Sequence, residues 1–486
     1  MYMDPLHPPT ARQQHAVLLI VSLGAFMVSI DATIVNIALP SIAQSFGIDM
    51  GLVSWVIMVY LLILISSLTI AGKLGDIKGF RYVFSAGCII FITGSVLCGI
   101  SATFGQLICF RALQGIGAAA LYAIGPAMIA EHLPARKRGW ALGIMTTIVS
   151  VGVAIGPLLG GFITEYANWN LIFFVNVPVG ILVLFISLSL LPSDIPTAVP
   201  AEFDLAGAVL IFFALLMFLF PVNRGLVLGW TSPAIIGTFT VSLVFFFLFF
   251  VRQHYCRHPI INMRIFKNRA FLAGNLIAFL LTLVINGAEF LFPFFFENVQ
   301  GLSPAVTGIL LAVPAVTLMV TGPVAGSLSD RYSPRILTTI ALTIALATFV
   351  MFSMFDAATA FPFIIAALAL EGIAIGLYSS PNTNQILSAG SGNEKGLSSS
   401  VMMTIRHFSS ALGVAIFGSA VLRIVFGTSS AKGVVPASVP ANQLVIGFQE
   451  VFLLGAILVF AALVLAVVMS WGTQKQDKKR GRESTR

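Results

Sequence analysis

Long apolar stretches alternate with short polar breaks along nearly the whole chain. Each stretch is about 20 residues long, the length that an α-helix needs to cross the hydrocarbon core of a bilayer. The stretches begin near Ala16, Leu52, Tyr82, Gly105, Gly139, Leu171, Asp204, Ser232, Ala270, Pro304, Arg335, Phe361, Leu397 and Gly447. This pattern predicts an all-α membrane protein with about 14 transmembrane helices.

Two polar breaks divide these stretches into groups. A linker with three prolines follows the first six stretches, and a basic loop precedes the last six. We also expect the polar and basic C-terminal residues to be disordered. The predicted organisation is a cytoplasmic N-terminal segment at 1–15, a six-helix bundle at 16–191, a linker at 192–203, two additional helices at 204–252, a basic cytoplasmic loop at 253–269, a second six-helix bundle at 270–471 and a basic cytoplasmic tail at 472–486.

A short charged turn occurs once in each predicted bundle. GKLGDIKGFR spans Gly72–Arg81, and GSLSDRYSPR spans Gly326–Arg335. Both turns place Gly, Leu, Asp and Arg at the same intervals, and internal repeats of this kind build many transporters. We therefore predict two related halves, each with a charged turn that takes part in conformational switching. The residues concerned are Gly72, Asp76, Arg81, Gly326, Asp330 and Arg335.

Composition excludes a water-soluble globular protein, because 58% of the 486 residues are hydrophobic and only 9% are charged. Soluble domains contain about 25% charged residues, so lipid must solvate most of this surface. The net charge of +8 reflects topology rather than nucleic-acid binding. With a cytoplasmic N-terminus, 21 of the 26 Lys and Arg residues fall in inner segments, three fall in outer loops and two lie inside apolar stretches. The positive-inside rule then predicts that both termini are cytoplasmic.

Ionisable side chains inside the apolar stretches are the candidate functional groups. Asp31 and Arg111 both lie about 21 Å from the cytoplasmic side, at 1.5 Å of rise per helical residue. An ionised group at this depth costs about 2.5–3.5 kcal/mol on insertion scales, so neither should face lipid. One interpretation is a static ion pair between two helices, and the other is a carboxylate that alternates between a proton and its partner. We favour the second, because buried ion pairs stabilise poorly.

The second half contains a similar set of intramembrane groups. Glu371 and Arg406 both lie near the middle of the membrane, where they form either a structural pair or part of the transport site. Glu289 is a second coupling or cation site, or a side chain that reaches the outer interface. The predicted proton-coupling residues are Asp31, Arg111, Glu289, Glu371 and Arg406. The predicted substrate cavity contains Asp31, Gln114, Glu289 and Glu371.

Glycines recur at every fourth position of the fifth stretch. Gly152, Gly156 and Gly160 share one helix face, on which a neighbouring helix can approach closely. Pro157 removes a backbone donor and bends the helix. We interpret this face either as ordinary tight packing or as a pliable contact that takes part in switching.

Several motifs resemble those of a known family. The turn at Gly72–Arg81 resembles the loop signature between helices two and three of the major facilitator superfamily. Four further stretches resemble motifs of its 14-helix drug:proton antiporter branch: Ile30–Pro40, Leu107–Gly117, Gly152–Gly161 and Asn176–Gly180. The resemblance implies a major facilitator fold and a monomer in the cell membrane. It also implies proton-coupled export of amphipathic, cationic compounds by alternating access.

Other classes of function are weakly supported or absent. The sequence contains no phosphate-binding Gly-x-x-x-x-Gly-Lys-Ser/Thr loop and no HExxH or GxSxG motif, so we predict neither an enzyme nor a cofactor. The four cysteines have no CxxC spacing, so we predict no metal. Two alternatives remain open, a proton-coupled transporter of one physiological metabolite or lipid and a transporter-like membrane sensor.

The charge distribution generates a test of topology. A reporter fused after Arg486 should be cytoplasmic, and one inserted near Gly433 should be outside, because Lys and Arg are retained on the inner side. Paired alkaline phosphatase and green fluorescent protein fusions measure both positions. Phosphatase activity from the C-terminal fusion would contradict an even number of spans.

Overall fold

The computed structural model describes residues 11–190, 204–256, 268–329, 332–388, 395–426 and 441–483. All regular elements in these ranges are helices. They are α1 (Ala11–Phe46), α2 (Met50–Val53), α3 (Trp55–Lys78), α4 (Phe80–Gly99), α5 (Phe104–His132), α6 (Ala135–Tyr166), α7 (Leu171–Phe174), α8 (Asn176–Leu190), α9 (Leu205–Leu228), α10 (Pro233–Tyr255), α11 (Arg269–Asn298), α12 (Pro304–Ser329), α13 (Pro334–Phe352), α14 (Phe361–Ser388), α15 (Lys395–Phe426) and α16 (Ala441–Glu483).

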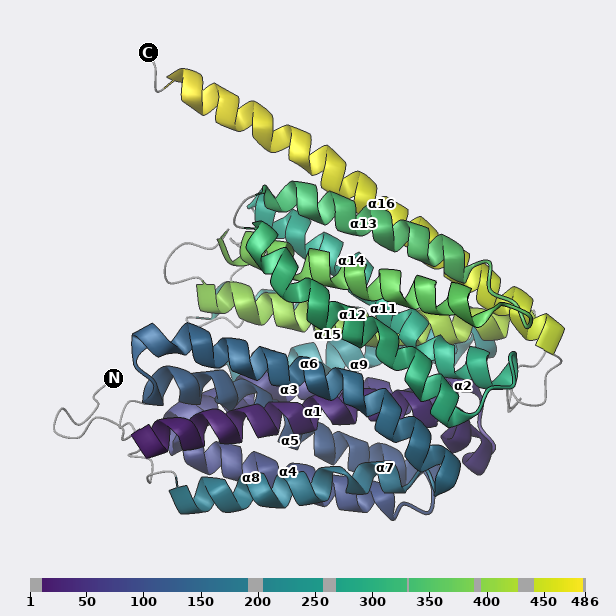
Figure 1. Ribbon diagram of the computed structural model, residues 1–486, viewed down its shortest axis with the longest axis horizontal. Coiled ribbons are helices and arrows are strands. Elements are labelled where there is room, and N and C mark those ends of the chain that lie inside the picture. Colours follow the sequence, from purple (N-terminus) through teal and green to yellow (C-terminus); the bar gives the residue numbers. More distant parts are fainter. Residues whose placement is uncertain are drawn as a thin grey trace.

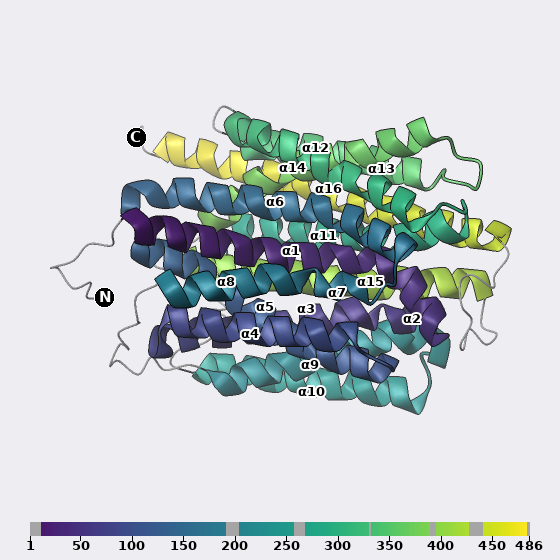
Figure 2. The same ribbon diagram turned by 60° about the horizontal axis from the view of Figure 1, so that its bottom comes forward.

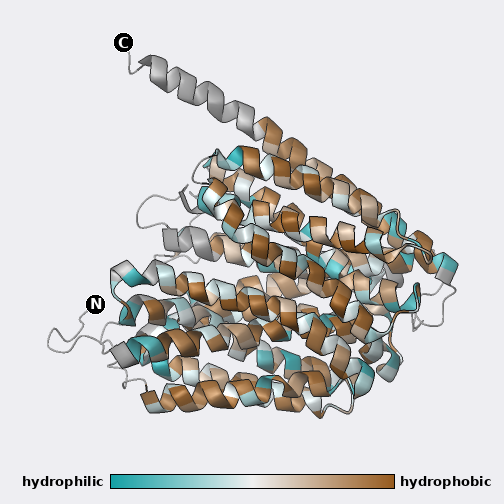
Figure 3. Cartoon of the chain, in the orientation of Figure 1, coloured by the Kyte–Doolittle hydropathy of each residue, from teal (hydrophilic) through white to brown (hydrophobic). Residues whose placement is uncertain are grey.

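The predicted number of spans is confirmed. Fourteen candidate membrane spans occur in the described ranges, with α2 and α3 forming the second and α7 and α8 the sixth. The start of α1 and the end of α16 lie on one side of the molecule, at the left of Figure 1. We call this side the terminal face and the other side the opposite face. Apolar residues cover the flanks of the helices, whereas polar residues gather at the two ends (Figure 3).

The spans form two bundles (Figures 1 and 2). In the N-terminal bundle, α1 packs against α5, α6 and α8, and α4 packs against α5. In the C-terminal bundle, α11 packs against α15 and α16, and α12 packs against α14. Each bundle is held by apolar side chains on the inner faces of its helices, and the outward residues suit lipid. Phe247 on α10, for example, is 66% exposed.

One seam between the bundles is formed by α6 and α12, which pack closely at the opposite face. A Cβ added to Gly161 would collide with the Pro304 carbonyl oxygen, and one added to Gly308 would collide with that of Pro157. The Glu165 carboxylate also accepts a hydrogen bond of 2.9 Å from the Ala305 amide. These contacts hold the two bundles together at the opposite face.

The same two helices are less tightly packed toward the terminal face. A Cβ added to Gly143 of α6, or to Gly322 or Gly326 of α12, would meet no other atom within 4 Å. The α6–α12 seam is therefore closed at one face and looser at the other.

The two additional helices cover the second seam. Helix α9 packs against α3 of one bundle and α15 of the other, and α10 packs on the outside of α9. This hairpin forms one edge of the molecule in Figure 2. Asn223 of α9 accepts a 3.1 Å hydrogen bond from the Trp55 indole and donates one of 3.0 Å to the Ser54 hydroxyl. The next residue, Arg224, pairs with Asp49 at 3.1 Å.

The charged turns are only partly described. Gly79 begins α4 with a φ of 99°, a left-handed conformation that favours glycine. Arg81 donates a 2.7 Å hydrogen bond to the Leu188 carbonyl at the end of α8, so it ties two helices of its own bundle together. The side chain of Asp76 and the whole of Asp330 lie outside the described residues, as do most of the predicted linker and basic loop.

The backbone of helix α16 continues from the last span to Glu483. Gln, Lys, Arg and Glu are strong helix formers, and a helix already nucleated in the membrane extends easily through them. The expected disorder of the polar tail stays a prediction.

The anchoring of α9 generates a stability prediction. Arg224→Ala should lower the free energy of unfolding by about 3–5 kcal/mol, because it leaves the buried Asp49 carboxylate without its countercharge. Thermal unfolding in detergent, followed by tryptophan fluorescence, measures the loss, and Asp49→Asn in the same chain should restore part of it.

Arg252→Ala is the matched control. Arg252 is 45% exposed, and its partner Asp204 keeps hydrogen bonds from Gly207 and Gln253. The Asp204 carboxylate is buried like that of Asp49, but it keeps these two donors, so the loss of stability should be smaller than that of Arg224→Ala. Equal losses in the two arginine variants would show that the α9 contact does not depend on the buried charge.

Candidate functional site

A buried polar network lies in the centre of the N-terminal bundle. The Arg111 guanidinium pairs with Asp31 at 2.8 Å, as the equal depths of the two residues predicted. Its Nε also donates to the Val56 carbonyl at 3.1 Å, and its charge lies 4.2 Å from the centre of the Tyr60 ring. Asp31 is 0% exposed and Arg111 1%. The pair thus joins α1, α3 and α5 inside one bundle.

Amide and hydroxyl groups complete this network. Gln114 and Asn176 each donate to Asp31 Oδ1, at 2.8 and 2.9 Å. Gln114 also donates a hydrogen bond of 2.7 Å to the Ser95 hydroxyl, and its own side-chain oxygen accepts one of 2.6 Å from Arg111. Sequence reasoning did not assign Asn176 or Ser95 to the site, although Asn176 begins one of the recognised motifs. In this conformation the arrangement matches the static interpretation of the ion pair.

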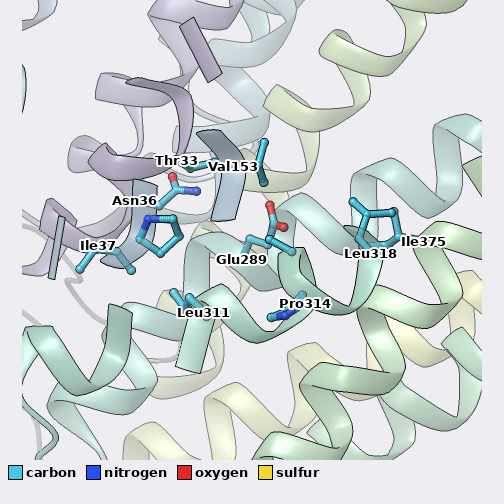
Figure 4. A pocket seen from close by; sticks show the side chains of 11 residues that line it. Thr33, Asn36, Ile37, Val153, Glu289, Leu311, Pro314, Leu318 and Ile375 are labelled. Atoms are coloured by element: carbon cyan, nitrogen blue, oxygen red, sulfur yellow. The ribbon is translucent and has the colours of Figure 1, made fainter. Parts of the chain in front are cut away.

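The described pocket lies elsewhere, at the meeting of α1, α6, α11, α12 and α14. Figure 4 shows the Glu289 carboxylate and the Asn36 amide on its wall, from helices of different bundles. Glu289, one of the predicted cavity residues, lines this pocket, whereas Asp31 and Gln114 are sealed in the network and do not line it. The wall consists of Thr33, Asn36, Ile37, Val153, Pro157, Glu289, Leu311, Pro314, Ala315, Leu318 and Ile375.

The pocket is small in this conformation. Its volume of about 60 Å³ has room for several water molecules, each of which needs about 10–15 Å³. Drug-sized ligands occupy pockets of about 300–1,000 Å³. A large substrate therefore requires the bundles to move apart.

Hydrogen-bond acceptors outnumber donors around the pocket. Glu289 contributes a carboxylate, the Asn36 Oδ1 atom finds no partner among the described residues, and none of the 11 lining residues is basic. Prolines free further acceptors, because a proline cannot donate to the carbonyl four residues earlier. Pro40, Pro157 and Pro293 follow the lining residues Asn36, Val153 and Glu289 by this interval. Such a pocket suits a proton, a cation or a ligand rich in N–H groups.

Glu371 lies beside this pocket, inside the C-terminal bundle. It is 2% exposed, and neither carboxyl oxygen has a hydrogen-bond partner among the described residues. Glu289 is close enough to act on it electrostatically. A buried carboxyl group without donors is stable only in its neutral form. Glu371 therefore differs chemically from Asp31, which is fully hydrogen-bonded.

The predicted structural pair between Glu371 and Arg406 is not formed. Arg406 Nη2 instead donates to the Thr383 hydroxyl at 3.1 Å. Equal depth in the membrane places two residues at the same height but does not determine the direction in which each side chain points. The adjacent His407 contacts Tyr122 of the other bundle edge to face, with ring centres 6.4 Å apart.

The predicted glycine face packs within its own bundle. Cβ atoms added to Gly152, Gly156 and Gly160 would collide with Ser29, Thr33 and Ile34 of α1. These glycines therefore join α6 tightly to α1. The contact with the other bundle is made by Pro157 and Gly161, on another side of the same helix.

Fourteen membrane spans in two six-helix bundles with an inserted hairpin, and a pocket at the seam with an acid on its mainly apolar wall, define the class as a membrane transporter. Residues 21–414 match the family model of the Major Facilitator Superfamily. The chain therefore belongs to this superfamily.

Relatives within the family transport different compounds. The chain is 31% identical to the riboflavin transporter RibZ of Clostridioides difficile over 468 residues, 96% of this chain and 99% of the relative. It is 31% identical to multidrug resistance protein 3 of Bacillus subtilis, over 84% of this chain and 80% of the relative. Its fold is similar to the crystal structure of a bacterial homologue of the human lysosomal transporter Spinster, with a TM-score of 0.67. The two sequences are 16% identical, and the match covers 96% of this chain and 98% of that chain.

The buried network generates a second stability prediction. Arg111→Met should destabilise the protein by about 3–5 kcal/mol, because it leaves Asp31 as an uncompensated buried charge. The double variant with Asp31→Asn should recover much of this loss. Thermal unfolding of the purified variants measures both effects. A double variant that is no more stable than Arg111→Met would show that the charge of Asp31 is not the cause.

Proposed function

We propose that this transporter is a proton-coupled antiporter that exports amphipathic compounds carrying a positive charge or several N–H groups. The observation that carries this proposal is the pair of neighbouring intramembrane acids, Glu289 and Glu371, neither of which pairs with a base among the described residues. Groups of this kind at membrane depth commonly mark transport paths. The multidrug transporters among the relatives favour the same substrate class.

The two acids suggest a division of roles. Glu289 lies on the pocket wall, where its carboxylate can bind a cationic group of the substrate. Glu371 does not line the pocket, and it has no hydrogen-bond partner among the described residues, a setting that favours the protonated form. Two acids this close influence each other, so binding of a cation at Glu289 changes the ease with which Glu371 loses its proton. Substrate and proton then compete for one pair of carboxyl groups, which is the requirement for exchange.

The direction of transport follows from the predicted topology. The cation distribution assigns the terminal face to the cytoplasm, so the seam is closed toward the outside in this conformation. A cytoplasmic substrate would reach the acids first, and a proton entering from outside would displace it after the bundles rearrange. The membrane potential favours inward movement of protons by about 2.3 kcal/mol per charge per 100 mV.

The seam between α6 and α12 is the proposed moving contact. The glycine face of α6 holds this helix against α1, so both should move with the N-terminal bundle. Pro157, Gly161 and Gly308 then form the surface that separates when the opposite face opens. Asp76, Asp330 and their turns are proposed to hold the terminal face in the opposite state. Alternating access by rocking of one bundle against the other would expose the acids to each side in turn.

Transport of a single metabolite is the second candidate. The alignment with the riboflavin transporter RibZ spans almost the full length of both chains, which favours this candidate. A flavin is a flat, uncharged ring system that stacks well on aromatic side chains. The described pocket has no aromatic residue on its wall, so it offers no such stacking in this conformation. Competition between riboflavin and unrelated dyes would separate the two candidates.

Replacing the two acids tests the proposed coupling. Glu371→Gln and Glu289→Gln should abolish uphill transport, because an amide cannot exchange a proton, while Glu371→Gln should still bind dye. The measurement is uptake of a fluorescent cationic dye into inverted vesicles, driven by a pH gradient, at matched protein levels. Glu450→Gln is the control, since Glu450 is an exposed acid at the opposite face.

The original hypothesis for Asp31 is tested in the same assay. Asp31→Asn retains the shape of the network but removes its negative charge. The proposal would be overturned if Glu371→Gln retained full uphill uptake of the dye and Asp31→Asn lost it. The coupling role would then belong to Asp31 and Arg111.

A further inference from the structure

A row of buried polar residues follows one face of α14. Glu371, Tyr378 and Asn382 stand at positions i, i+7 and i+11. At 3.6 residues per turn, residues with this spacing lie on the same face of the helix. They span about 16 Å along the axis, from mid-membrane toward the terminal face. The described part of α14 continues with Thr383, Asn384 and Gln385, and Asn384 is exposed. The row therefore connects a buried acid with a polar end of the bundle.

Each of these three side chains has an unsatisfied polar atom. Their exposed fractions are 2%, 5% and 1%, and both Glu371 oxygens, the Tyr378 hydroxyl and the Asn382 Nδ2 atom find no partner among the described residues. Nearly all buried polar atoms in folded proteins are hydrogen-bonded. Where protein partners are absent, ordered water fills polar cavities of this kind. Three such residues on one helix face indicate a line of bound water.

Backbone geometry supports the same line of bound water. Pro381 cannot donate to the Leu377 carbonyl, so a further acceptor is left free between Tyr378 and Asn382. Helical side chains lean toward the N-terminus of their helix, which directs the Tyr378 hydroxyl toward Glu371. A tyrosine hydroxyl and water molecules can each accept one proton and donate another.

The three residues of this row do not line the described pocket, although Ile375, which lies on the same face of α14 between Glu371 and Tyr378, does. Helix α14 contributes no other residue to the described pocket wall. The charged or titratable neighbours on packed helices are Glu289 of α11 and Arg406 and His407 of α15. Helix α12 has no charged residue in its described length, and α13 has only Arg335 at its start. Arg406 acts electrostatically on Tyr378, so a proton should pass this point without resting there.

We propose that this face of α14 holds a water-filled proton path that links Glu371 to the terminal face through residues that do not line the substrate pocket. The inference rests on the proposed coupling role of Glu371. Tyr378 and Asn382 act as positioning residues that hold the water chain, and the bonds broken and formed are O–H bonds only. Such a path allows Glu371 to release its proton while a substrate occupies the pocket.

Hydrogen–deuterium exchange at Glu371 tests the path directly. The neutral carboxyl group has an infrared C=O band that shifts in D₂O, and Glu371→Gln identifies this band in the purified protein. Tyr378→Phe and Asn382→Leu should slow the shift by about tenfold, the factor that corresponds to the loss of one hydrogen bond in the chain. Asn382→Ser leaves space and a polar group for water, so it should exchange at nearly the wild-type rate.

Two controls separate the path from general effects. Tyr255→Phe makes the same chemical change on the exposed surface of α10, and Ala315→Leu narrows the pocket wall. Neither should slow exchange at Glu371. The proposed path would be overturned if Ala315→Leu slowed exchange while Tyr378→Phe and Asn382→Leu exchanged at the wild-type rate. Protons would then reach Glu371 through the pocket.

A different result is expected if the proposed function, rather than the proton path, is wrong. In that case the Glu371 band is absent from the wild type, or Glu371→Gln retains uphill dye uptake. If Asn382→Leu does not fold, Tyr378→Phe carries the test alone, because it removes a single oxygen atom. A wild-type exchange rate in Tyr378→Phe then overturns the proposal.

Discussion

The high cost of an unpaired charge in a medium that cannot solvate it governs this structure. Asp31 sits deep in the membrane and is surrounded by Arg111 and two amide donors, so its charge is fully compensated. Glu371 sits at comparable depth with no hydrogen-bond donor among the described residues. One bundle thus retains a stable ionised carboxylate, whereas the other contains a carboxyl group whose charge state must depend on conformation and neighbours.

This asymmetry gives the two bundles different physical roles. The network around Asp31 and Arg111 joins α1, α3, α4, α5 and α8, and the glycine face of α6 adds a sixth helix, so the N-terminal bundle is suited to move as one body. The C-terminal bundle leaves polar groups unpaired along α14 and beside the seam. Water, a proton or a substrate can bind where the protein provides no partner of its own.

The sequence predicted the spans and one ion pair well, for identifiable reasons. Span length follows from bilayer thickness, and the match in depth between Asp31 and Arg111 was sufficient because helices α1 and α5 are in contact. The same arithmetic failed for Glu371 and Arg406, since depth does not define the direction of a side chain around its helix. Asn176 and Ser95 were missed because neutral polar residues incur a small penalty and are common in apolar stretches.

The prolines connect the pocket with the movement of the helices. Three lining residues, Asn36, Val153 and Glu289, each precede a proline by four positions, on helices from both bundles. Each proline weakens its helix at that level and releases a carbonyl oxygen into the same region. In lipid such a carbonyl is tolerated only where protein or water can reach it. The points at which these helices can bend are therefore also the points that carry free acceptors, so a ligand bound there would act directly on the hinges.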